Sequence, residues 1–373
     1  MRRRLIRIAL ILLLFPPLLG AVAGWLAGPA YLHPIRRALT PDLIREADAS
    51  FAVTHSQRQD FNVRAPDGVL LRGWTVRPPN ANGSWVLLFH GVADNRVGTI
   101  GPSEILLRAG YSVVMMDARA HGASEGPIAT YGWLERNDTR ATIDALIDSE
   151  LSPCLSIQWS GLGSPCPGPR HLYALGESMG AGIALQSAAA DARIEAVVAE
   201  APFASLREAS YDYAGLRWSP LLGKTLFAPF SWALMYRGES LAGFSATGVS
   251  PEKAVAARPF PVLLICDGQD VALPCRHSEM IYAAARGPKQ LWVVPGAYHT
   301  AALGFQPEEF RRRVLAFFAA AQHPNPAPPA GWPSASGVPF RNRNFTIFIN
   351  QDIRNRSGKP RNGMAGEILG SLR

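Results

Sequence analysis

Six short apolar runs alternate with helical patterns along most of the 373-residue chain, and this alternation limits the fold more than any other feature. Each run reads as a strand buried on both faces. The strands are expected at residues 85–89, 111–116, 172–175, 196–199, 261–266 and 290–294, and the helices at 133–148, 179–190, 276–286 and 307–321, with one more ending near residue 109. Such regular alternation predicts an α/β fold with a mostly parallel central sheet and helices on both faces.

Crossovers between parallel strands have a fixed hand, so the carboxyl ends of the strands meet at one rim of the sheet. Before this part, residues 51–78 alternate apolar and polar with a break at Asp67-Gly68, as two antiparallel strands joined by a turn would. Polar residues that could carry chemistry follow the strand ends: His90, Asp117, Ser178, Glu200, Asp270 and His299. These side chains can therefore converge at the rim although they are far apart in sequence.

Ser178 lies in the pattern Gly176-Glu-Ser-Met-Gly180, between an apolar strand and an Ala-rich helix. A serine on such a sharp turn has a strained backbone, and small residues two positions away let strand and helix close around it. The N–H of Met179, at the start of the helix, would point at charge developing on a bound carbonyl oxygen. The pattern predicts a nucleophilic serine.

A serine hydroxyl needs a histidine to take its proton and a carboxylate to orient that histidine. The chain supplies these groups in the order Ser178, Asp270, His299. For the carboxylate, Asp267 and Glu200 remain alternatives to Asp270. For the base, His299 is favoured by elimination, since His277 opens a helix and is expected at the surface.

With these motifs in hand, the sequence resembles the α/β-hydrolase superfamily, and more narrowly an esterase-like branch related to serine aminopeptidases and prolyl oligopeptidases. The resemblance covers about residues 51–321. It rests on His90-Gly91, the run from Asp117 to Gly126, the helix start from Tyr131 to Asp138, the serine turn, and Asp270-x-x-x-Pro274. It implies the catalytic triad Ser178, Asp270 and His299, with a second oxyanion donor in the N–H of Val92 beside that of Met179.

Several other polar residues in these motifs are given structural roles. The resemblance treats His90 and His121, which precede glycines, as groups that hold their own loops. Asp117 is expected to anchor the loop of Arg119. Glu135 and Asp138 share one helical face and are expected to form a solvated or structural pair.

The N-terminus combines four arginines with a long uncharged stretch, most apolar from residue 8 to residue 26. Its length fits a transmembrane helix, and the arginines favour a cytoplasmic N-terminus with the remainder exported. A cleaved signal peptide and a buried core helix remain alternatives, because Ala21-Val-Ala23 resembles a cleavage site. We therefore expect residues 1–33 to be a membrane anchor or signal segment, with the catalytic domain on the periplasmic or extracellular side, or secreted after cleavage.

The net charge of +8 is concentrated at the ends of the chain. Residues 1–40 hold six arginines and no acid, and residues 324–373 hold seven Lys or Arg against two acids. The body between them is slightly acidic, which speaks against a nucleic-acid partner. We expect residues 322–373, which are rich in Pro and then in Arg and Asn, to be mostly disordered.

Four cysteines are present, and their simplest pairing is Cys154–Cys166 and Cys266–Cys275, which suits an oxidising compartment. Four unpaired thiols are the alternative. No spacing resembles a zinc site, so no metal is expected, and nothing in the chain calls for a cofactor.

The remaining organisation is a linker at residues 34–50 and a hydrolase domain at 51–321, interrupted at 203–257. This insertion is rich in Tyr, Trp, Leu and Phe, which predicts a small helical cap whose side chains line an acyl pocket or, for most of them, the core of the cap itself. The expected activity is hydrolysis of short to medium or lipid-like acyl esters through an acyl-enzyme. An aminopeptidase or amidase, a thioesterase, an acyltransferase and a non-catalytic binding module remain alternatives.

Overall fold

The computed structural model of the chain describes residues 2–159 and 169–322, and within them all strands join one eight-stranded sheet. The strand order is β1-β2-β4-β3-β5-β6-β7-β8. Only the β1–β2 and β2–β4 pairs are antiparallel, and the other pairs are parallel. The strands are β1 Gln57–Arg64, β2 Leu70–Arg77, β3 Ser84–Phe89, β4 Ser112–Met116, β5 His171–Glu177, β6 Ala196–Glu200, β7 Val262–Asp267 and β8 Lys289–Val294.

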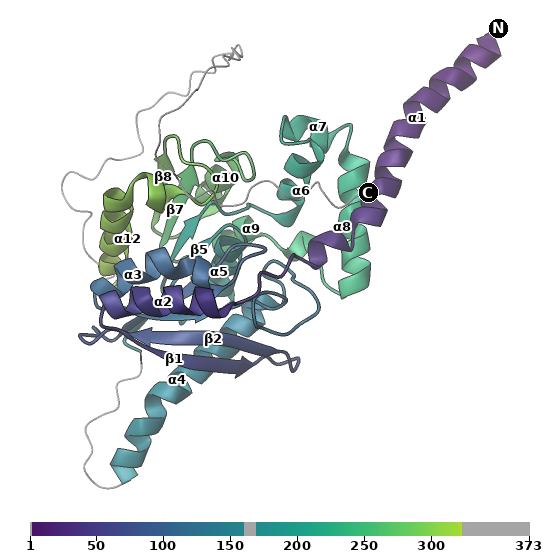
Figure 1. The fold of residues 1–373 in the computed structure, drawn as a ribbon. Helices are drawn as coiled ribbons and strands as arrows, with labels where there is room; N and C mark the ends of the chain where they lie inside the picture. Colours follow the sequence, from purple (N-terminus) through teal and green to yellow (C-terminus); the bar gives the residue numbers. More distant parts are fainter. Residues whose placement is uncertain (1, 160–168, 323–373) are drawn as a thin grey trace. The chain divides into compact units, whose positions relative to one another are not determined.

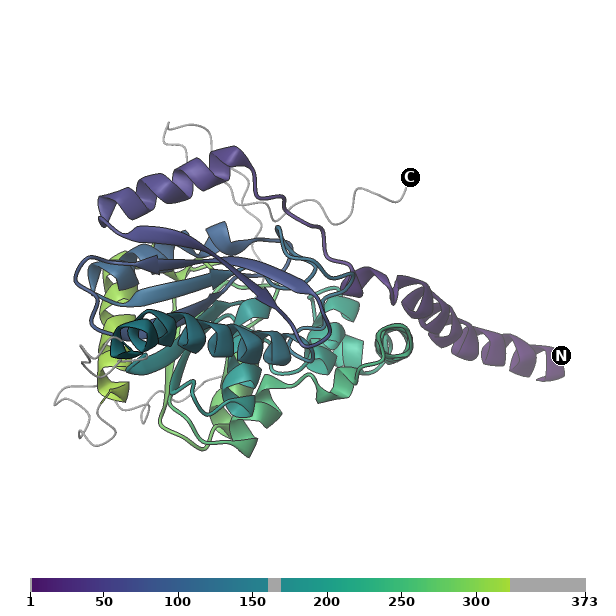
Figure 2. The same cartoon turned by 90° about the horizontal axis from the view of Figure 1, so that it is seen from below.

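Helices cover both faces of this sheet (Figures 1 and 2). One face carries α2 Pro41–Val53, α3 Ile100–Arg108, α11 Ala302–Phe305 and α12 Pro307–Ala321. The other carries α4 Glu135–Trp159, α5 Met179–Ala190, α9 Pro251–Ala257 and α10 Arg276–Ala284. The expected α/β-hydrolase fold is thus confirmed, and strands and helices alternate as the apolar runs predict.

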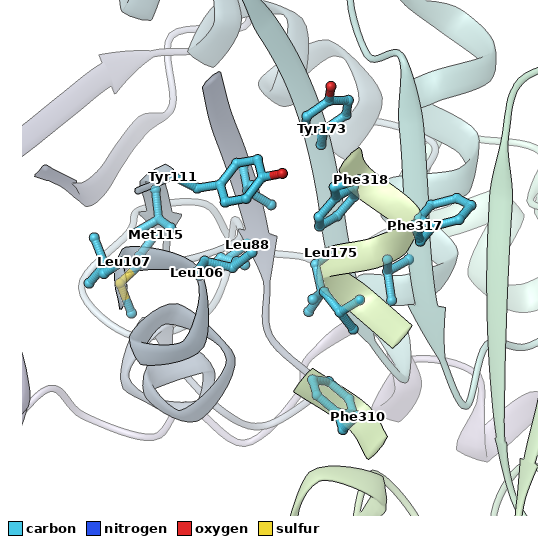
Figure 3. Packing of buried hydrophobic residues seen from close by; sticks show 14 of the residues in the cluster. Leu88, Leu106, Leu107, Tyr111, Met115, Tyr173, Leu175, Phe310, Phe317 and Phe318 are labelled. Carbon is cyan, nitrogen blue, oxygen red and sulfur yellow. The ribbon is translucent and has the colours of Figure 1, made fainter. Parts of the chain in front are cut away.

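Close-packed apolar side chains fix α12 against the centre of the sheet (Figure 3). The ring of Phe318 stacks on that of Tyr173 in β5, with 4.8 Å between ring centroids. Phe310 and Phe317 of the same helix are also buried in this cluster. Because α12 follows the loop that carries His299, this packing fixes one end of that loop.

The segment expected to be a linker, residues 34–50, contains most of helix α2. Thr40 caps the helix by accepting a hydrogen bond from the N–H of Leu43, and Pro41 occupies the first turn, where its missing N–H has no cost. Ala47 and Phe51 lie one turn apart and are buried in the core. The capping residues and this apolar spacing signal a helix that the sequence analysis did not recognise.

The expectation of a transmembrane or signal anchor at residues 1–33 is wrong, and the expected placement of the catalytic domain outside the cytoplasm loses the anchor on which it rested. Across residues 2–159 and 169–322, none of the helices combines the length and the apolar character that crossing a membrane requires. Residues 2–27 do form a helix, α1 Arg2–Ala27, but it contains Pro16 and Pro17. Its C-terminal half uses its glycines to pack against another helix of the protein.

That partner is α8 Ala228–Ala242, beside which α1 runs (Figure 1). A Cβ atom on Gly24 would overlap the main-chain oxygen of Phe230, and one on Gly28 would lie 2.5 Å from Cβ of Arg237. The guanidinium group of Arg237 also stands 4.8 Å from the ring centroid of Trp25. The two backbones therefore meet at positions where only glycine fits.

Residues 203–257, between β6 and β7, hold α6 Leu206–Ala214, α7 Pro220–Lys224, α8, the short helix η3 Ala246–Gly248 and α9. Phe203, Met235 and Phe244 are buried in a cluster of their own. Trp218, by contrast, is 82% exposed, and Trp232 is also exposed. The aromatic residues of this insertion are thus divided between its core and its surface.

Cys266 and Cys275 form a disulfide, as expected, with their Cα atoms 5.3 Å apart. It closes the loop between β7 and α10, the loop that carries Asp270. The expected Cys154–Cys166 pair and the expected disordered tail fall outside the described residues.

Candidate active site

Ser178 is the single residue between the end of β5 and the start of α5, and its backbone has φ 54° and ψ −118°. A positive φ in a non-glycine residue is strained, and here the N–H of Ser178 is held by the main-chain oxygen of Glu200 at 2.9 Å. A Cβ on Gly176 would lie 2.5 Å from the carbonyl carbon of Gly180, and one on Gly180 would lie 2.6 Å from the oxygen of His90. Both glycines of the motif therefore stand where a side chain cannot.

The structure brings Ser178, His299 and Asp270 into one hydrogen-bonded chain. Oγ of Ser178 lies 2.8 Å from Nε2 of His299, and Nδ1 of His299 lies 2.6 Å from Oδ2 of Asp270. The other oxygen of Asp270 accepts the N–H groups of Ala272 and Leu273, at 2.7 and 2.9 Å. The side chain of Asp270 is fully buried, whereas the imidazole of His299 remains about one-third exposed, so this hydrogen-bonded chain reaches solvent at the imidazole.

Asp267 and Glu200, the two alternative carboxylates, do not contact the imidazole ring. Asp267 accepts the N–H of Thr300 at 2.8 Å, and Glu200 accepts that of Ala302 at 2.9 Å. Burial raises the pKa of Asp267 to about 7 and that of Glu200 to about 8, and nearby Asp270 acts in the same direction on both. Asp270 is the carboxylate placed to orient His299.

The two N–H groups expected to bind an oxyanion belong to Val92 and Met179. In the described part of the chain no acceptor takes either group. The loop that carries Val92 adjoins the serine, because a Cβ on Gly91 would lie 3.6 Å from Cβ of Ser178. Both N–H groups thus lack an acceptor, and each belongs to a segment that adjoins Ser178.

The other rim histidines hold loops. Nε2 of His90 accepts the N–H of Ala118 at 3.0 Å, which leaves Nδ1 to donate to the oxygen of Gly91 at 2.7 Å. Nδ1 of His121 lies 2.9 Å from the oxygen of Arg119, and burial, with a smaller effect of His90, lowers the pKa of His121 to about 4.

The charged residues of the neighbouring loop are buried and paired. Asp117 binds the guanidinium group of Arg96 at 2.7 Å and the N–H of Ala123 at 2.7 Å, so it anchors the Arg119 loop without contacting Arg119. Arg119 instead pairs with Asp138 at 2.6 Å. Glu135 accepts the N–H of Thr130 and of Gly132, so the Glu135 and Asp138 pair is structural and not solvated.

His277, expected at the surface, is completely buried. Its Nδ1 accepts the N–H of Ala204, and its Nε2 donates to Asp212 at 2.6 Å. Arg276 reaches the same carboxylate from α10. This link ties α6 of the insertion to α10. Glu208 and Asp212 lie four residues apart on α6, and both pair with Arg276. Their spacing on one helical face is the sequence signal that could have indicated this link.

Among residues 2–159 and 169–322, no three His, Cys, Asp or Glu side chains are arranged to hold a metal ion.

The chain belongs to the α/β hydrolase family, whose model matches residues 86–313. It is 28% identical over 296 residues to the uncharacterized protein YqkD of Bacillus subtilis, covering 76% of this chain and 88% of that protein. It is 27% identical over 252 residues to the α/β hydrolase domain-containing protein WAV2 of Arabidopsis thaliana, covering 65% of this chain and 72% of that protein.

Solved structures share the fold. The esterase Pf2001 of Pyrococcus furiosus superimposes with a TM-score of 0.55 at 22% identity, covering 78% of this chain and 100% of the esterase. The acylaminoacyl peptidase of Pyrococcus horikoshii superimposes with a TM-score of 0.51 at 13% identity, covering 71% of this chain and 41% of the peptidase.

Proposed function

We propose that this protein is a serine hydrolase that cleaves carboxylic esters of short to medium acyl chains through an acyl-enzyme. The observation that carries the proposal is the unbroken hydrogen-bonded chain from Asp270 through His299 to Ser178. A serine hydroxyl in this setting can lose its proton to the imidazole at the moment it attacks. The strained turn around Ser178 holds the hydroxyl above the end of the strand, where a substrate carbonyl can approach.

The proposed reaction has two halves. Oγ of Ser178 attacks the ester carbonyl, its proton moves to Nε2 of His299, and the carbonyl oxygen gains a negative charge that the N–H groups of Val92 and Met179 stabilise. His299 returns the proton to the departing alcohol as the ester bond breaks. A water molecule, deprotonated by His299, then attacks the acyl-serine. The bond between the acyl carbon and Oγ breaks, the carboxylic acid leaves, and His299 returns the proton to Oγ of Ser178.

The insertion at residues 203–257 is proposed as the cap that limits the acyl group. Its link to α10 through Asp212 and His277 begins beside the loop of Asp270, so the insertion is fixed close to the triad. The apolar character of the insertion supports an acyl ester as substrate rather than a charged peptide.

The test uses the full-length chain and a fluorophosphonate, which reacts only with an activated serine. Label is expected in the wild type and absent in Ser178→Ala, and p-nitrophenyl esters from acetate to laurate are expected to show an optimum at short or medium length. If aminoacyl nitroanilides are turned over faster than the p-nitrophenyl esters, the protein is an aminopeptidase. If acyl thioesters are turned over faster than these esters, it is a thioesterase. A folded wild type that takes no label would favour a binding module on the hydrolase fold.

A further inference from the structure

Three carboxyl groups stand in a row beside the triad, at the ends of β5, β6 and β7. Glu177 pairs directly with Glu200 across β5 and β6, and Asp267 ends the next strand, two residues beyond Ile265, the pairing partner of Glu200. Successive side chains on a strand alternate between faces, so each acid shares the face of the core residue two positions before it. These core residues are Leu175, Val198 and Ile265, which belong to one cluster. The three acids therefore lie on one face of the sheet.

Glu200 contacts two catalytic segments at once. Its main-chain oxygen accepts the N–H of Ser178 at 2.9 Å, and its side-chain Oε1 accepts the N–H of Ala302 at 2.9 Å. Ala302 lies three residues after His299 and begins α11. Glu200 thus connects the turn of the nucleophile with the loop of the base.

Asp267 makes the corresponding connection for the acid. Its main-chain oxygen accepts the N–H of Asp270 at 3.0 Å, and its Oδ2 accepts the N–H of Thr300 at 2.8 Å. Thr300 follows His299 directly and has φ 53°, a strained conformation for a non-glycine residue. The hydrogen bond that this N–H donates to the buried carboxyl group of Asp267 stabilises the conformation that directs the imidazole toward Asp270.

We propose that Glu200 and Asp267 are positioning residues that hold the His299 loop at its hydrogen-bonding distance from Ser178 on one side and from Asp270 on the other. The proposal rests on the triad of the proposed function, and it assigns a role to two carboxyl groups that do not touch the imidazole. The reaction rate is sensitive to the position of a catalytic group, since a shift of about 1 Å can lower the rate about a hundred-fold.

Burial favours the protonated form of all three carboxyl groups in this row. Burial raises the pKa of Glu177 as well as that of Glu200 and Asp267. The charged or titratable groups that face the row are Asp94, Asp270 and His299, and Oδ1 of Asp267 is buried without a partner among the described residues. A protonated carboxyl group still accepts through its carbonyl oxygen, so the bonds to the loop do not require a charge.

Because an amide also accepts through its carbonyl oxygen, the isosteric amide variants separate positioning from charge. Glu200→Gln and Asp267→Asn are expected to label with fluorophosphonate within about three-fold of the wild-type rate at pH 7. Glu200→Ala and Asp267→Ala are expected to lose ten- to about a hundred-fold in labelling rate and in kcat, with KM little changed. Glu177→Gln is the matched control, since Glu177 lies in the same row but accepts no N–H of the loop, and it is expected to label like the wild type.

A second measurement does not depend on activity. The proton between Nδ1 of His299 and Oδ2 of Asp270 is expected to give a low-field NMR signal in the full-length protein, unchanged in Glu177→Gln and shifted or lost in both alanine variants. Alanine variants that label at the wild-type rate and keep this signal would overturn the positioning roles while leaving the hydrolase intact. A wild type that takes no label but shows the signal, with loss in the alanine variants, would count against the hydrolase and support the positioning roles.

Should the alanine variants fail to fold, the amide variants still test the proposal. Amide variants that label within about three-fold of the wild type would support positioning through the carbonyl oxygen, whereas an amide variant that labels at least ten-fold slower than the wild type at pH 7 would contradict the proposal.

Discussion

Gly176 and Gly180 close on each other beneath Ser178, with the position of a Cβ on Gly176 overlapping the carbonyl group of Gly180. The neighbour is main chain at the start of α5, so it cannot move aside as the end of a flexible side chain can. The position of Ser178 beyond the end of β5 therefore depends on having glycine, with no side chain, at both 176 and 180.

Replacing Gly176 by alanine is expected to destabilise the protein by about 2–3 kcal/mol and to abolish fluorophosphonate labelling, because the new methyl group forces α5 away from β5. Urea unfolding and labelling measure the two effects. The control is Gly304→Ala, where a Cβ would meet nothing within 4 Å, so stability should stay the same or rise by up to about 1 kcal/mol. Equal stability of the two variants would refute the close packing.

Asp270→Asn is expected to lower kcat about ten-thousand-fold with little change in KM. An amide NH₂ at Oδ2 would donate toward Nδ1 of His299 and favour the tautomer that cannot take the serine proton. Steady-state ester hydrolysis measures the loss. Asp144→Asn, at an exposed ion pair with Arg193, should retain wild-type kinetics. A loss below ten-fold for Asp270→Asn would remove Asp270 from the triad.

Burial of Glu200 and Asp267 should make stability depend on pH in a defined direction. Their pKa values of about 8 and about 7 in the fold exceed the ordinary values of 4.5 for Glu and 3.8 for Asp, so the folded protein keeps protons that the unfolded chain releases. The free energy of unfolding should therefore fall as pH rises from about 5 to 8, an interval in which unfolding releases protons.

Urea unfolding at pH 5, 6, 7 and 8 measures this slope, and the comparison with Glu200→Gln cancels the contributions of groups that do not interact with Glu200. The variant should gain stability relative to the wild type as pH rises. A constant difference across the series would show that Glu200 ionises normally.

The contact between α1 and α8 distinguishes two glycines one helical turn apart. Gly24→Ala would press a methyl group into the backbone of Phe230 and should destabilise the protein by about 1–3 kcal/mol. Gly20→Ala should be tolerated or mildly stabilising, since its Cβ would lie 3.8 Å from the nitrogen of Phe230, an ordinary contact. Thermal unfolding of both full-length variants measures the difference. Similar unfolding midpoints for Gly24→Ala and Gly20→Ala would contradict the close contact between α1 and α8 at Gly24.

Much of this fold could be predicted because its signals are local. The helix from Met179 to Ala190 and the strand from Ala196 to Glu200 lie close to where the apolar pattern predicts them. The spacing of Ser178, Asp270 and His299 relative to strand ends was enough to expect them at one rim, since all parallel strands end there.

The errors have a common physical cause, which is that burial of a segment depends on partners far away in sequence. The apolar start of the chain indicated a membrane span because nothing in residues 1–33 reveals that Gly24 and Gly28 fit against α8. His277 looked like a surface residue because its partner, Asp212, lies 65 positions earlier. Glu200 and Asp267 were weighed only as alternative acids, since their side-chain bonds to the His299 loop exist only after folding.

The contact between α1 and α8 at Gly24 also affects how far the N-terminus can be shortened for experiments. A chain trimmed at residue 34 or 41, as one would trim a leader, loses the helix on which α8 rests and leaves Gly238 without its close neighbour Tyr31. The trimmed hydrolase would still hold its triad, but the insertion above it would have one side newly opened to water. A substrate preference measured on the trimmed chain would then differ from that of the chain that keeps α1.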